Sequence, residues 1–155
     1  MKKILFMLLI SAVSPFAHAD QMFYCSTQKT APPQQVLVNF DREKLDSGGN
    51  GQGSVTISSF NNGTGTWTPI TSLNKATAQI KVYWTQDAKR VHAIVIDMGR
   101  TGKITIATKG FYSRYDSTEA WVSGNLKDFN FPEGIVFELC SYGTSRKPAG
   151  MTGSN

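Results

Sequence analysis

The sequence predicts an all-β fold, a single antiparallel domain of about 8–9 strands in a meander-type small barrel, with a β-sandwich as the alternative. Short segments that alternate apolar and polar residues recur along the chain, with turn residues about every ten positions. Helical periodicity is almost absent. The two cysteines lie near the start and the end of the alternating region, where the first and last strands of a closed barrel are neighbours.

Residues 75–97 form the centre of the predicted domain. Apolar side chains occupy every second position from Ala76 to Trp84, and the positions between them are mostly polar. This period of two indicates a strand with one buried face. A polar connection over 86–90 leads into an almost continuous apolar run over 91–96. The pair predicts an antiparallel hairpin whose second strand is buried on both faces or nearly so.

The remaining elements follow from the same alternation and from turn residues. Asn61, Asn62 and Gly63 indicate a tight turn between two strands, because they tolerate the positive φ that such turns need. Residues 41–46 are charged and predict one helical turn, whereas 47–53 are rich in glycine and predict a flexible connection. Strands are predicted over 21–26, 36–40, 54–60, 64–70, 103–107, around 120–122, and over 135–140.

Residues 1–19 predict a secretory signal peptide of bacterial type. Lys2 and Lys3 precede an apolar run, and Ala17-His18-Ala19 matches the small-x-small pattern of a cleavage site. The protein is therefore expected to be periplasmic or secreted. We expect one β domain over 20–141 and a flexible tail over 142–155, which is rich in Gly, Ser and Thr. No later segment predicts a membrane span.

The charge pattern argues against a nucleic acid partner. Loss of Lys2 and Lys3 with the leader leaves 14 basic side chains against 11 acidic ones. The basic residues are scattered, whereas nucleic acid binding usually shows a clustered basic footprint. Beyond the leader the chain offers one histidine, His92, and two distant cysteines, which is too few for the usual four-ligand zinc site. No metal site and no cofactor are predicted.

Cys25 and Cys140 are predicted to form a disulfide. An even number of cysteines in an exported protein indicates a bridge rather than free thiols. If the strands close into a barrel, this bridge would join the first strand to the last. A sandwich could use the same bridge, so the pairing does not by itself decide the architecture.

The sequence offers little for catalysis, and no catalytic residue is predicted. His92 is expected to share a face with Ile94 and Ile96, which indicates a structural rather than a catalytic histidine. No Gly-x-Ser-x-Gly nucleophile motif is present. Carboxylates such as Asp116 and Glu119 lie in loop segments, but a two-carboxylate glycosidase needs only that such residues meet in space.

One segment between two predicted strands is a candidate binding loop. It carries Tyr112, Arg114 and Tyr115, and tyrosine and arginine are residue types enriched at binding hot spots. The alternative is that the aromatic side chains of this loop cap the core. Trp67 and Trp121 could extend such a surface, but both are expected in the core.

Together these features predict an exported soluble bacterial β domain that acts as a binding module or inhibitor towards a protein or cell-envelope partner. Two alternatives stay open: a carrier of a small apolar ligand in the barrel lumen, and a glycan-acting enzyme. Enzymatic activity is the less favoured interpretation. A filled interior would argue against the carrier, because it leaves no room for a ligand. The partner and the oligomeric state are not predicted.

Overall fold

The computed structural model describes residues 21–110, 112, 117–127 and 136–144. These residues form nine strands and three short 3₁₀ turns. The strands are β1 (Gln21–Thr27), β2 (Gln34–Phe40), β3 (Asn50–Asn61), β4 (Thr66–Pro69), β5 (Ala76–Trp84), β6 (Val91–Asp97), β7 (Gly102–Thr108), β8 (Ser117–Leu126) and β9 (Val136–Thr144). The 3₁₀ turns are η1 (Arg42–Lys44), η2 (Thr71–Leu73) and η3 (Gly99–Thr101).

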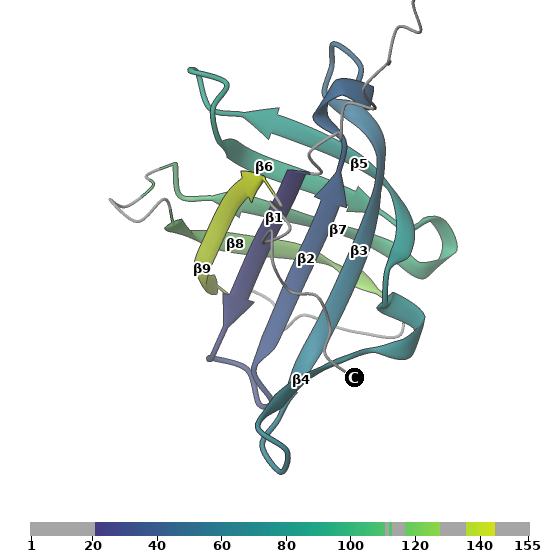
Figure 1. Cartoon of the computed structure of the whole chain (residues 1–155), viewed down its shortest axis with the longest axis vertical. Coiled ribbons are helices and arrows are strands. Elements are labelled where there is room, and N and C mark those ends of the chain that lie inside the picture. The colour runs from purple at the N-terminus through teal and green to yellow at the C-terminus, as the bar shows by residue number, and fades with distance from the viewer. Residues whose placement is uncertain (1–20, 111, 113–116, 128–135, 145–155) are drawn as a thin grey trace, which may run out of the picture.

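Eight of the strands close into an antiparallel barrel. Around it they follow the order β1-β2-β3-β5-β6-β7-β8-β9, and β9 pairs with β1 to complete the circle. The short β4 pairs with β3 and stands outside this circle. Figure 1 shows β9, β1, β2 and β3 as a front layer, with β5–β8 crossing behind them. The predicted small barrel with meander connections is confirmed.

The disulfide joins the first and last strands at the point where the barrel closes. Cys25 and Cys140 are directly opposite each other in the β1–β9 ladder, with their Cα atoms 4.1 Å apart. Both side chains are buried in the hydrophobic core. The predicted Cys25–Cys140 bridge is confirmed.

The interior of the barrel is filled by side chains from every strand of the circle. The residues of β2 alternate strictly between buried and half-buried, as a strand with one core face requires. Phe23, Phe137 and Ile94 are among the large side chains with no exposed surface. Leu73 of η2 joins the same cluster from outside the strands. The inward-facing residues therefore form one continuous hydrophobic core.

The strand β3 begins earlier than the sequence predicts, because residues 50–53 are strand rather than flexible connection. Gly53 pairs with Phe40 of β2 on one side and with Ala78 of β5 on the other. A Cβ at Gly53 would lie 2.9 Å from the carbonyl oxygen of Asn39. The absence of a side chain at Gly53 lets β3 pair closely with β2 and with β5 at the same position.

Gly49 closes the connection into β3, and its replacement should be costly. Its φ is +78°, and an added Cβ would overlap the Val82 carbonyl oxygen. Gly65 has a similar φ of +67° but nothing within 4 Å of its added Cβ. We expect Gly65→Ala to cost about 1–2 kcal/mol from backbone strain alone. Gly49→Ala should lower the free energy of unfolding, measured in urea, by more than Gly65→Ala does. Equal losses for the two variants would show that the backbone near Val82 moves and relieves the overlap.

Three expectations about individual positions are not met. Trp121 was expected in the core but is 52% exposed, because its neighbours Ala120 and Val122 take the inward positions of β8. Trp67 is half-buried and packs edge-on against Phe60, at 5.3 Å between ring centroids. The strand β9 continues to Thr144 and so includes the first three residues of the segment expected to form the tail.

Candidate functional site

One end of the barrel gathers three connections that are far apart in the sequence. Because neighbouring strands run in opposite directions, every second connection lies at the same end. The connection through η1, the β5–β6 turn and the β7–β8 connection therefore share one end of the barrel. Side chains from all three contribute to the site described below.

An aromatic cluster covers part of this end. Trp84 makes an edge contact with Tyr142, with ring centroids 5.6 Å apart, and Phe40 packs against both rings. The Arg42 guanidinium carbon lies 4.3 Å from the centre of the Trp84 ring. Arg42 Nη2 also donates a hydrogen bond to the carbonyl oxygen of Ala88, at 2.9 Å. Arg42 therefore fixes the η1 connection to the β5–β6 turn.

Tyr142 ties the last strand into this cluster. Its hydroxyl donates a hydrogen bond of 2.6 Å to Oε1 of Gln21 on β1. Burial raises the pKa of the Tyr142 hydroxyl above its ordinary value, so the group stays protonated and remains a donor at neutral pH.

The β5–β6 turn is held by its own hydrogen bonds. The Thr85 hydroxyl donates to Oδ1 of Asp87 at 2.5 Å, and the Lys89 backbone N–H donates to the same oxygen at 3.1 Å. The Arg90 backbone N–H donates to the Thr85 hydroxyl oxygen at 3.2 Å. The hydrogen bond from Thr85 is the main cause that lowers the pKa of Asp87, so its carboxylate is ionised at neutral pH.

A bulge directly after this turn places His92 on the outside of the barrel. Trp84 pairs with Val91, but Tyr83 pairs with Ala93, so His92 is an extra residue without a partner in the ladder. Val91 points inward and His92 is exposed. The expectation that His92 shares the buried face of Ile94 was wrong, because the bulge shifts the alternation by one residue.

The β7–β8 connection stabilises the bulge from the neighbouring side. The Thr108 hydroxyl donates a hydrogen bond of 2.7 Å to the His92 carbonyl oxygen, and the Tyr112 hydroxyl donates to the Val91 carbonyl oxygen. The Arg90 guanidinium carbon lies 5.1 Å from the centre of the Tyr112 ring. These contacts orient Tyr112 and Arg90 relative to the exposed His92.

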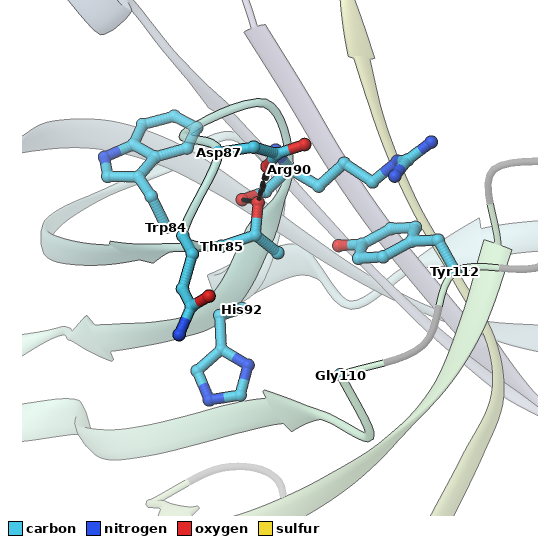
Figure 2. Close-up of a pocket in the computed structure, with 8 residues that line it drawn as sticks. Trp84, Thr85, Asp87, Arg90, His92, Gly110 and Tyr112 are labelled. Carbon is cyan, nitrogen blue, oxygen red and sulfur yellow. Dashed lines mark hydrogen bonds between the residues drawn. The ribbon is translucent and has the colours of Figure 1, made fainter.

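These side chains line a pocket of about 590 Å³ at the barrel end. Figure 2 shows Trp84 on one side of it and Tyr112 on the other, with His92 beneath. Within the described part of the chain, the side chains of Gln86 and His92 form no hydrogen bond. The lining residues are Trp84, Thr85, Gln86, Asp87, Arg90, His92, Gly110 and Tyr112.

The structure places one of the three predicted binding residues in this pocket. Tyr112 lines it and is half-buried, whereas Arg114 and Tyr115 lie outside the described residues. The contribution of the β5–β6 turn was not predicted. The sequence carries one signal: Val91 and Ile94 are both apolar but three positions apart, a spacing that an unbroken period of two cannot place on one face.

Comparisons with known proteins add no identity to this site. The chain matches no protein-family model, and neither curated proteins nor solved structures provide a match. In the described ranges, no group of three or more His, Cys, Asp or Glu side chains could hold a metal ion. Across the same residues, the structure contains no helix of the length and apolarity needed to cross a membrane.

Proposed function

We propose that this protein is an exported binding module or inhibitor that engages a protein or cell-envelope partner through the barrel end around Trp84 and Tyr112. The observation that carries the proposal is the convergence of aromatic and polar side chains from the β5–β6 turn and the β7–β8 connection on one pocket. Binding residues commonly lie on loops that a rigid scaffold positions, and here the scaffold is the closed barrel.

The filled interior favours this function over transport of a small apolar ligand. A lumen carrier needs a cavity inside the barrel, but the inward side chains of this chain pack into one core. The pocket at the barrel end is outside that core and has several polar lining residues. It is therefore better suited to a polar partner than to an apolar cargo.

The same pocket supports binding more than glycoside hydrolysis. Among the lining residues that the structure describes, Asp87 is the one carboxylate. Most glycosidases place two carboxyl groups about 5–10 Å apart, one on each side of the bond that they cleave. A single ionised carboxylate can accept hydrogen bonds from a ligand, but it does not supply this pair.

The proposed compartment is the periplasm or the extracellular space. The predicted leader over 1–19 supports export, and a disulfide that joins the first and last strands fits an oxidising environment. Mass spectrometry of the exported protein would test this directly, since cleavage after Ala19 leaves Asp20 as the first residue.

The binding function can be tested with the predicted loop residues. We expect Arg114→Ala/Tyr115→Ala to change the free energy of unfolding by no more than about 0.5 kcal/mol, the usual range for surface positions. The same variant should weaken binding of the partner captured from periplasmic extract by about 1–2 kcal/mol, as hot-spot residues do. A lowered melting temperature with intact binding would instead assign these residues to the core.

A further inference from the structure

The pocket at the barrel end presents a particular combination of groups. Gln86, Asp87, Arg90 and His92 have planar polar side chains, and they line the pocket together with the rings of Trp84 and Tyr112. Figure 2 shows His92 beneath the two rings. Planar amide, carboxylate and imidazole groups can bind adjacent hydroxyl groups, because each hydroxyl both donates and accepts a hydrogen bond. Aromatic rings provide apolar surface for the C–H faces of the same ligand.

The charges of the pocket favour a ligand without net charge. Its described lining residues include one carboxylate, on Asp87, and one guanidinium, on Arg90. Both protein donors to Asp87 bind its Oδ1, so Oδ2 keeps its capacity to accept a hydrogen bond from a ligand. The Asp87 carboxylate disfavours an anionic ligand such as a phosphate, and the Arg90 guanidinium disfavours a cationic one, so neither charge sign is selected by the pair.

The unpartnered side chains argue against an apolar ligand. The side chains of Gln86 and His92 make no hydrogen bond within the described residues, and both residues are exposed to water. An apolar ligand that covered them would leave their polar atoms without hydrogen-bond partners, which is unfavourable. A polyhydroxyl ligand would replace the lost water with its own hydroxyl groups. The volume of about 590 Å³ is within the usual range for small-ligand pockets.

We propose that this pocket binds a neutral sugar unit of a glycan chain, through hydrogen bonds from its hydroxyl groups to Gln86, Asp87 and His92. This inference rests on the proposed binding function and names the chemical class of its ligand. Trp84 and Tyr112 provide the flanking apolar surfaces. The Arg42 and Arg90 guanidinium groups hold these two rings in place before the ligand arrives.

The test is a titration of the protein, followed by amide chemical shifts, with the trisaccharides of N-acetylglucosamine, glucose and mannose. At least one trisaccharide should shift resonances of the β5–β6 turn in a saturable way at or below about 10 mM. Comparison of the three sugars then distinguishes an amino-sugar glycan of the envelope from a glucose or mannose polymer. Inorganic phosphate, titrated in parallel, should leave these resonances unchanged.

Two variants make the test specific. Gln86→Ala/His92→Ala should weaken binding of the active trisaccharide at least about tenfold, because it removes two ligand hydrogen bonds but none within the protein. Gln79→Ala is the matched control. It removes an exposed glutamine from β5, the strand that precedes the turn with Gln86, at a second pocket of about 500 Å³ on the outer wall of the barrel. The affinity of the Gln79→Ala variant for the active trisaccharide should stay within about twofold of that of the native protein.

Three results would overturn the inference: no trisaccharide shifts the turn resonances, phosphate shifts them instead, or Gln86→Ala/His92→Ala binds the sugar as tightly as the native protein. A protein partner whose capture depends on Gln86 and His92, without sugar binding, would refute the glycan assignment and leave the binding function standing. If partner capture is unaffected by Gln86→Ala/His92→Ala and by Arg114→Ala/Tyr115→Ala alike, the barrel end is not the recognition surface.

Discussion

Removal of the Cys25–Cys140 disulfide is expected to lower the free energy of unfolding by about 4–5 kcal/mol. The two cysteines are separated by 115 positions in the sequence, so the bridge constrains almost the whole unfolded chain. The loss of conformational entropy in the unfolded state grows with the length of the closed loop. Urea unfolding of the protein with and without reductant measures the difference.

The double variant Cys25→Ala/Cys140→Ala separates this effect from other actions of the reductant. It should unfold at the same urea concentration whether or not reductant is present. A stability loss below about 1 kcal/mol in both the reduced protein and the double variant would contradict the prediction. Such a result would mean that the β1–β9 ladder alone closes the barrel.

Phe137→Ala is expected to destabilise the protein by about 3–5 kcal/mol, the usual cost of deleting a buried aromatic ring. Phe137 has no exposed surface and belongs to the central hydrophobic cluster. The substitution leaves a cavity that the closed barrel can collapse around only in part, because each strand is held by ladders on both sides. The midpoint of urea unfolding reports the loss.

Leu139→Ala on the same strand is the control for Phe137→Ala. Leu139 is 44% exposed, so its truncation should change the free energy of unfolding by no more than about 0.5 kcal/mol. Similar losses for the two variants would show that the inward and outward faces of β9 differ from those in the structure. A regular strand would place residues two positions apart on the same face. This pair therefore tests the irregularity between β8 and β9, where Ala120 pairs with Phe137 but Thr118 pairs with Cys140.

The barrel could be predicted from the sequence because its main features are local or depend on the cysteines. The alternation in 75–97 indicated β5 and β6, and the residues Asn61 to Gly63 indicated the turn after β3. The positions of Cys25 and Cys140 brought the first and last strands together. Each of these signals belongs to a short segment or to a covalent bond. All of them can therefore be read without knowledge of the packed structure.

The faces of individual side chains could not be predicted where a ladder contains an extra residue. His92 was placed inward because an unbroken period of two was assumed, and the bulge reverses it. A second irregularity occurs between β8 and β9, where Thr118 pairs with Cys140 but Ala120 pairs with Phe137. Such shifts in pairing register depend on the neighbouring strand. In β6 the shift determines that His92 points outward and lines the candidate pocket.

The pocket itself was predicted only through Tyr112. Its other aromatic wall, Trp84, was assigned to the buried face of a strand and is instead half-buried at the barrel end. The polar residues of the β5–β6 turn form no recognisable motif, because their convergence with Tyr112 depends on the strand order and not on sequence spacing. Sequence reasoning therefore found the architecture more readily than the site.

The pairing of β4 with a single neighbour bears on how the protein behaves at high concentration. Among the described strands, the eight in the circle have both edges paired, whereas β4 keeps one free edge. A free edge can recruit strands from other molecules and begin fibrillar aggregation. Here that edge is four residues long and ends at Pro69, which lacks the N–H group that a recruited strand would need. The barrel therefore offers a poor template for aggregation.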